Sequence, residues 1–115
     1  MRFKLDFITG QSELNADYRR YVLSFIKNAL SQSVNGNLLD RYYTDTHTKD
    51  FSWTMIVSKP RFTKEKFQFA DNKFSLVFST DDGKQTGMYL MLAFLNQKNR
   101  KYPVQEGNFI TLKKI

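Results

Sequence analysis

The sequence predicts an α+β domain of the ferredoxin-like (RRM-like) class, a split βαβ arrangement in which two helices cover one face of an antiparallel four-stranded sheet. The main evidence is the order of the elements, because strand and helix patterns follow as strand, helix, strand, strand, helix, strand. Each strand has one apolar face and each helix one apolar stripe, so the elements can bury one another. With 115 residues, the chain has the length of one domain.

The first part of the chain predicts a strand and a helix. Met1 to Ile8 alternate between apolar and polar side chains, which is the period of a half-buried strand. A polar connection over 10–16 leads to a helix from Asp17 to about Gln32, with Asp17 as its N-cap. Asn-Gly-Asn at 35–37 breaks this helix, and 38–43 suits a short helical turn. The apolar stripe of the helix consists of Tyr18, Tyr21, Val22, Phe25, Ile26, Ala29 and Leu30.

The middle of the chain predicts two more strands. Alternation from Phe51 to Lys59 indicates the second strand, which Pro60 ends. Residues 62–69 suit either a short extra strand or a loop. The third strand runs from Asn72 to Thr80, with Phe74, Leu76 and Phe78 on one face.

A helix and a strand complete the predicted order. The helix is capped by Asp82 or Thr86, runs to about Lys98, and carries Met88, Met91, Leu92 and Leu95. A basic connection over 99–107 follows. The last strand, Asn108 to Ile115, points Ile110 and Leu112 inward.

Composition excludes several classes of protein. No apolar run approaches the roughly 18–20 residues of a membrane span, and the N-terminus lacks the apolar block of a signal peptide. Without Cys, neither disulfides nor thiolate metal sites can form. The apolar content of 41% is sufficient for a core, which should be largely aromatic. The simplest compartment for such a chain is the cytoplasm.

The charge balance predicts a polyanionic partner. Eighteen Lys and Arg against 11 Asp and Glu give a net charge of +7. Such a charge is typical of nucleic-acid binding, although a solvated cationic surface would look the same. The basic residues form three sequence clusters: Lys59, Arg61, Lys64 and Lys66; Lys98, Arg100 and Lys101; and Lys113 and Lys114, beside Arg2 and Lys4 if the terminal strands are neighbours.

Motifs of metal and cofactor enzymes are missing from the sequence. The five glycines are scattered, so no phosphate-cradling loop is present, and one histidine cannot make a zinc pair. Carboxylates such as Asp45, Asp50, Asp81 and Asp82 sit in turns or beside basic residues, which favours caps and solvated charges over magnesium ligands. No metal and no cofactor are therefore expected.

The single histidine, His47, is the candidate for acid–base chemistry. It lies in a polar, basic loop before the second strand. Histidine is the only side chain whose unperturbed pKa lies near neutral pH. A solvated loop histidine is the alternative interpretation.

The open face of the sheet is not predicted to stack bases. RRM domains that do so carry aromatic residues on the outer face of the first and third strands. Here those outer positions hold Arg2, Lys4 and Asp6 on the first strand, and Ser75, Val77 and Ser79 on the third.

Several segments in order resemble a known family. They are the start Met1-Arg2-Phe3-Lys4-Leu5, the helix over 18–30, Asn37-Leu38-Leu39-Asp40, the His47 loop and Phe51-Ser52-Trp53-Thr54. Together with 67–115, including Gly107-Asn108-Phe109-Ile110, they resemble the N-terminal domain of the CRISPR repeat-processing endoribonucleases, the Cas-six family of the RAMP superfamily.

The resemblance implies metal-independent cleavage within a CRISPR repeat RNA. The ribose 2′-OH would attack the adjacent phosphate and leave a 2′,3′-cyclic phosphate, which requires a base, an acid and cations. It implies an acid–base role for His47, a cationic role for Lys49, and Tyr42 or Tyr43 as the residue that orients the scissile nucleotide. Many members carry a tyrosine where this chain has Lys27. The residues expected to contact RNA are Lys27, Arg41, Lys59, Arg61, Lys64, Arg100 and Lys101.

Family members are about twice as long and have a second similar domain with a glycine-rich segment. The resemblance therefore implies that residues 1–115 are the N-terminal half of a two-domain protein. Its expected partners are the repeat RNA, the C-terminal domain of the same protein and a second copy in a homodimer, with no membrane. The isolated half would carry only part of the catalytic centre.

Two other functions remain open from the sequence. The chain could be a non-catalytic RNA-binding module, such as a subunit that holds a processed guide RNA. It could also be a protein-interaction domain whose charge only keeps it soluble, with its partner on the open sheet face.

Overall fold

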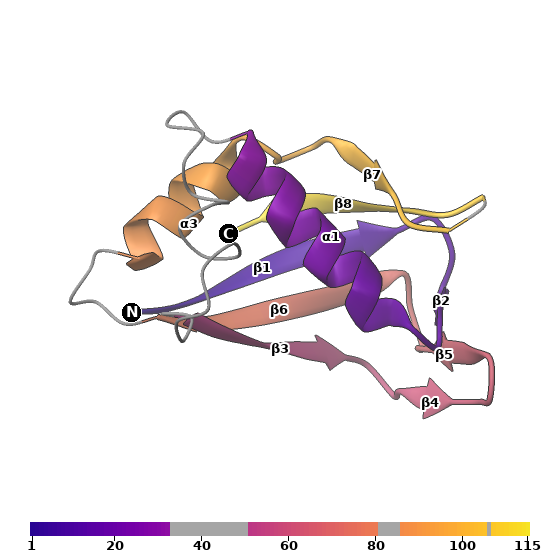
Figure 1. Cartoon of the computed structure of the whole chain (residues 1–115). Coiled ribbons are helices and arrows are strands. Elements are labelled where there is room, and N and C mark those ends of the chain that lie inside the picture. Colours follow the sequence, from indigo (N-terminus) through magenta and orange to yellow (C-terminus); the bar gives the residue numbers. More distant parts are fainter. Residues whose placement is uncertain (33–50, 81–85, 106) are drawn as a thin grey trace.

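The computed structural model describes residues 1–32, 51–80, 86–105 and 107–115. They form an antiparallel five-stranded sheet with two helices on one face, and a small three-stranded sheet at one end (Figure 1). The elements are β1 (Arg2–Thr9), β2 (Glu13–Asn15), α1 (Tyr18–Ser31), β3 (Phe51–Val57), β4 (Arg61–Phe62), β5 (Lys66–Gln68), β6 (Lys73–Thr80), α3 (Thr86–Leu95), β7 (Lys101–Pro103) and β8 (Phe109–Lys114).

The main sheet has the strand order β3-β6-β1-β8-β7. Its first four strands have the order of the split βαβ fold, which confirms the predicted fold class. The predicted four strands become five because part of the basic connection over 99–107 pairs as β7 with β8. Tyr102 stabilises this hairpin: its ring packs edge-on against Phe25 at 5.5 Å, and its hydroxyl shares a hydrogen bond with Ser24.

The core lies between the main sheet and the two helices. The inward residues predicted on β6 and β8 are buried. Of the three predicted on β1, Leu5 and Phe7 are buried and Phe3 is half-buried. Many of them are aromatic, and stacked rings such as Phe7 and Phe74, at 4.7 Å, link neighbouring strands. The buried core consists of Leu5, Phe7, Val22, Phe25, Ile26, Ala29, Leu30, Phe74, Leu76, Phe78, Leu90, Ala93, Phe94, Ile110 and Leu112.

The apolar stripe predicted for α3 is wrong, because a different side of the helix is buried. Met88, Leu92 and Leu95 are about half exposed and Met91 is half-buried. The fully or almost fully buried positions are instead Leu90, Ala93 and Phe94. The helix also ends at Leu95 rather than near Lys98. Its sequence is apolar nearly all round, so spacing alone could not show which side faces the sheet.

The caps differ from the predictions as well. Helix α1 begins after Asp17, as expected, but the Asp17 carboxylate makes no capping hydrogen bond. It pairs instead with the Arg20 guanidinium at 3.0 Å, because the backbone at Asp17 is not in the extended conformation of a capping residue. Thr86 is the first residue of α3 and is fully buried, while Asp82 lies outside the described residues.

The small sheet was only partly predicted. It has the order β2-β5-β4. The polar connection over 10–16 contains β2. The segment 62–69, whose sequence suits either a strand or a loop, provides β5 and the end of β4. On this sheet Leu14, Phe67 and Phe62 occupy paired positions and therefore share one face.

Candidate nucleic-acid interface

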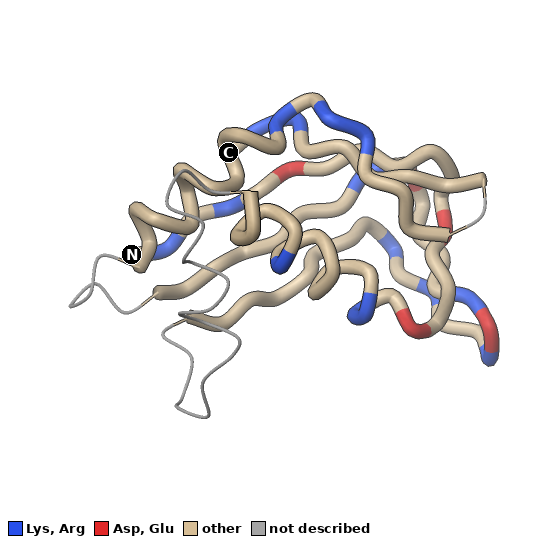
Figure 2. The backbone as a smooth tube through the Cα atoms, turned by 45° about the horizontal axis from the view of Figure 1, so that its top comes forward, with Lys and Arg blue, Asp and Glu red and all other residues tan. Residues whose placement is uncertain are grey.

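Five basic residues gather along the β7 edge of the main sheet. A turn after α3 brings 98–101 beside the end of β8, because the Asn99 N–H donates to the Leu112 carbonyl at 2.8 Å. Lys113 Nζ also donates to Asn99 Oδ1 at 3.5 Å. Two clusters that are separate in the sequence therefore become one, which Figure 2 shows along the upper rim. We call the exposed residues Lys98, Arg100, Lys101, Lys113 and Lys114 the edge cluster.

Lys101 belongs to the edge cluster and also covers an aromatic ring. It pairs with Thr111, and Pro103 pairs with Phe109, so Lys101 and Phe109 lie on the open face of the sheet. Lys101 Nζ lies 4.5 Å from the centre of the Phe109 ring, a cation–π contact. The open faces of β1 and β6 hold no aromatic residue, as predicted, but β8 contributes this half-buried one.

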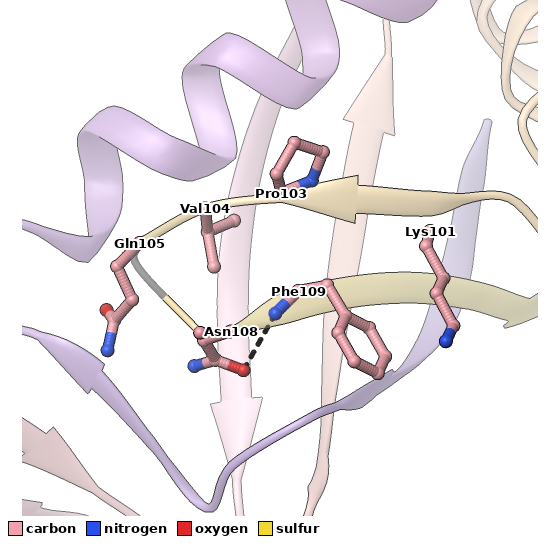
Figure 3. Close-up of a pocket in the computed structure, with 7 residues that line it drawn as sticks. Lys101, Pro103, Val104, Gln105, Asn108 and Phe109 are labelled. Atoms are coloured by element: carbon pink, nitrogen blue, oxygen red, sulfur yellow. Dashed lines mark hydrogen bonds between the residues drawn. The ribbon is translucent and has the colours of Figure 1, made fainter.

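A hollow of about 690 Å³ opens at the β7–β8 hairpin (Figure 3). Its lining includes Lys101, Pro103, Val104, Asn108 and Phe109. The volume lies within the range of about 300–1,000 Å³ that is usual for small-molecule sites. The lining combines one cation, one aromatic ring and the side-chain amides of Gln105 and Asn108.

Asn108 fixes the base of this hairpin. It is 4% exposed. Its Oδ1 accepts hydrogen bonds from the N–H groups of Gln11 (3.0 Å) and Phe109 (2.8 Å). Its Nδ2 donates to the Glu13 carbonyl at 2.9 Å. Because all three contacts are with backbone groups, Asn108 couples the hairpin rigidly to the β1–β2 connection.

A second hollow, of about 410 Å³, lies on the open face between β6, β1 and β8. Three lysines line it, namely Lys73, Lys113 and Lys114. Its one carboxylate, Asp6, is already engaged, since it accepts from Ser75 Oγ at 2.7 Å and pairs with Lys4 Nζ at 3.7 Å. The hollow is therefore positively charged and suited to phosphate oxygens.

The remaining predicted RNA contacts do not join the edge cluster. Lys59 follows β3, which is the opposite edge strand from β7. Arg61 and Lys64 lie in and just after β4, on the small sheet, and Lys27 is exposed on α1. The six predicted residues that the structure describes thus do not form one contiguous patch.

The predicted catalytic residues cannot be placed. His47, Lys49, Tyr42 and Tyr43 lie outside the described residues, as does the predicted RNA contact Arg41. The described chain stops at Gln32, after α1, and resumes at Phe51, the first residue of β3.

The described residues offer cations rather than a metal site. Over the described ranges, no group of three or more His, Cys, Asp or Glu residues could hold a metal ion.

Arg20 has a raised pKa, first because it donates a hydrogen bond to the Tyr21 hydroxyl and then because Asp17 is close. It therefore stays charged.

Sequence reasoning missed Lys73 and the hollow that it lines. Lys73 lies opposite Ile8 across the β1–β6 pair, which brings it near Lys113 and Lys114. This proximity depends on the pairing of β6, β1 and β8, so the sequence alone could not identify Lys73 as part of a basic site. Neither described helix is long and apolar enough to span a bilayer.

Comparison with known proteins identifies a solved structure with a similar fold. No protein-family model and no curated protein matches the chain. A solved structure described as "CRISPR associated protein Cas6" matches with a TM-score of 0.63 and 21% sequence identity. The match covers 100% of this chain and 49% of that chain, so this chain spans about half the length of the Cas6 chain. At this identity the two share a fold.

Proposed function

We propose that this chain is the N-terminal half of a CRISPR repeat-processing endoribonuclease. The observation that carries the proposal is the Cas6-like fold, which extends over the whole chain and about half of the Cas6 chain. The edge cluster and the lysine-lined hollow support it, because an RNA substrate needs such groups for its phosphates. The C-terminal domain, a homodimeric assembly and a cytoplasmic location belong to the same proposal.

The proposed reaction is metal-independent transesterification. The ribose 2′-OH attacks the adjacent phosphorus, the bond to the 5′ oxygen breaks, and the products carry a 2′,3′-cyclic phosphate and a 5′-OH. His47 transfers the proton, Lys49 stabilises the charge on the phosphorane, and Tyr42 or Tyr43 orients the nucleotide. Lys27, Arg41, Lys59, Arg61, Lys64, Arg100 and Lys101 hold the RNA in this proposal.

The test is single-turnover cleavage of a cognate repeat RNA by the protein that carries this chain with its companion domain. We expect His47→Ala to slow cleavage by about 10²–10⁴-fold, the usual contribution of a general acid or base. Thr46→Ala, a change at the preceding sequence position, is the matched control and should cleave at the wild-type rate. A wild-type rate for His47→Ala would remove this residue from the mechanism.

Two further readouts test the chemistry. A 2′-deoxy substitution at the nucleotide before the scissile phosphate should abolish cleavage because it removes the nucleophile. EDTA should leave the rate unchanged. A product with a 3′-OH, or a rate that depends on Mg²⁺, would contradict the proposed reaction.

The second candidate function is a non-catalytic RNA-binding subunit, for example one that holds a processed guide RNA. The favouring observation is that the described cations lie near both edges of the sheet, which suits binding along an extended RNA. This function predicts salt-dependent binding with no cyclic-phosphate product from the complete protein.

A further inference from the structure

We propose that the β4–β5 hairpin and the first turn of α1 form a binding site for one unpaired nucleobase of single-stranded RNA, which stacks on the free face of Phe62. The inference rests on the proposed function insofar as that function makes RNA the ligand. It assigns base contacts to a surface away from the edge cluster, where sequence reasoning placed only charges.

Phe62 is exposed but firmly supported. Phe62 and Phe67 are directly paired across β4 and β5, and their rings stack at 4.4 Å with an interplanar angle of 4°. Phe67 is itself buried and contacts the Tyr18 ring at 4.6 Å. Phe62 remains 65% exposed although Phe67 stacks on one face of its ring and the Tyr18 ring lies 6.5 Å away, tilted by 42°. We infer that the face turned away from Phe67 is open to a ligand.

The hairpin is held in place before any ligand arrives. Thr63 closes the turn, because its N–H donates to the Lys66 carbonyl at 2.8 Å and its hydroxyl oxygen accepts from the Lys66 N–H at 3.0 Å. The Ala16 N–H donates to the Glu65 carbonyl at 2.9 Å, which fixes the hairpin to the start of α1. Binding to such a preformed surface loses little conformational entropy.

An apolar hollow adjoins the aromatic stack. It has a volume of about 370 Å³ and includes Tyr18, Ile56, Pro60, Phe62 and Phe67 in its lining. Ile56 is 53% exposed, so the apolar surface continues onto β3. A flat aromatic ring that stacked on Phe62 could therefore also cover apolar surface beside it.

The positive charges around the aromatic stack favour a nucleic acid over an apolar partner. Residues 59–66 hold four basic side chains and one acidic one. Lys59 and Lys64 lie just before and just after β4, are exposed, and make no ion pair with any described residue. Arg61 lies on the other face of the small sheet, opposite Gln68.

The nearby acids change this balance little. Asp17 is paired with Arg20 at 3.0 Å, and Glu13 lies 3.9 Å from Lys66 Nζ. A second copy of a chain with a net charge of +7 would be repelled here, whereas a polyanion is attracted. An aromatic platform beside lysines is the usual design for binding single strands, with the base on the ring and the phosphates at the cations.

The experiment measures base stacking directly in the protein that carries this chain. A single-stranded RNA with one 2-aminopurine is titrated, its position being varied along the strand, and both affinity and fluorescence are recorded. We expect quenching at one position, and Phe62→Ala should abolish that quenching and weaken binding by about tenfold, as for the loss of one stacked base. Phe62→Trp should retain both.

The matched control is Leu92→Ala, which removes another exposed apolar side chain, 55% exposed, from α3. It should change neither affinity nor quenching. Unchanged binding and quenching in Phe62→Ala would overturn the inference, as would a dimer that Phe62→Ala converts to a monomer without an effect on RNA. These measurements do not require cleavage. The proposed stacking site can therefore be disproved while the proposed nuclease function holds, and the nuclease function can be disproved while the stacking site holds.

Discussion

Lys101 Nζ lies 4.5 Å above the centre of the Phe109 ring, across the β7–β8 pair. The ring in turn lies against the backbone of Gly10, whose N–H donates to the Phe109 carbonyl at 3.0 Å. The contact holds one cation of the edge cluster on the open sheet face. A positioned cation loses less side-chain freedom when it binds a phosphate than a freely rotating lysine does.

Lys101→Ala should weaken RNA binding mainly through the phosphates. We expect a loss of a few-fold in affinity at low salt, because one cationic contact is removed. The slope of log K against log salt should fall in magnitude by about 0.7, the value for one phosphate contact to a single strand. Titrations at several salt concentrations, with fluorescence anisotropy as the signal, would measure it.

Lys101→Arg is the matched variant, since it keeps both the charge and the contact with the ring. It should have the wild-type slope. An unchanged slope in Lys101→Ala would show that this lysine does not touch the RNA.

Gly10→Ala should destabilise the protein by about 1–3 kcal/mol, the range for overpacking a well-filled site. An added Cβ would lie 2.8 Å from Phe109 Cε1 and 3.2 Å from Asn108 Oδ1. The Phe109 ring would have to move, and this movement would disturb its cation–π contact with Lys101. Urea unfolding would measure the loss of free energy.

A double variant that combines Gly10→Ala with Phe109→Leu tests whether the clash with the Phe109 ring causes the loss of stability. A smaller side chain at 109 should relieve the clash, so the double variant should lose less than the sum of the two single losses. Strictly additive losses would contradict the clash.

The sheet was predictable because alternation places residues on faces without knowledge of their neighbours. Phe74, Leu76 and Phe78 on β6 are buried as the pattern predicted. The pattern did not predict β7, because three residues with a proline carry too weak a periodic signal. Tertiary contacts of Tyr102 with α1 stabilise that strand, and the local sequence does not encode them.

The candidate interface was predictable only as charge. Sequence clusters identified Arg100 and Lys101, but the union with Lys113 and Lys114 depends on strand pairing. The Phe62 platform was missed because a phenylalanine is expected in the core, and only the fold leaves its ring exposed. No described residue tests the prediction of His47.

Asn108→Ala should cost about 2–4 kcal/mol of stability. The change removes the acceptor for two backbone N–H groups and the donor to the Glu13 carbonyl. Each hydrogen bond contributes about 0.5–1.5 kcal/mol to stability, and three of them are lost together. The exposed Asn96, just after α3, provides the control, and Asn96→Ala should change stability by less than about 0.5 kcal/mol. Equal losses in the two variants, measured by thermal or urea unfolding, would show that the Asn108 network does not hold the hairpin.

Phe94→Ala and Leu95→Ala test which side of α3 faces the sheet. Phe94 is 0% exposed and packs on Phe78 at 5.1 Å, whereas the adjacent Leu95 is 49% exposed. Removal of a buried phenylalanine usually costs about 3–5 kcal/mol, because it combines lost transfer energy with a cavity. Such a loss is a large part of the roughly 5–15 kcal/mol that stabilises an ordinary domain. Urea midpoints at an unchanged m-value should therefore fall steeply for Phe94→Ala and by little for Leu95→Ala. The reverse order would mean that α3 is rotated about its axis, and the stripe of Met88, Leu92 and Leu95 read from the sequence would then be the buried one.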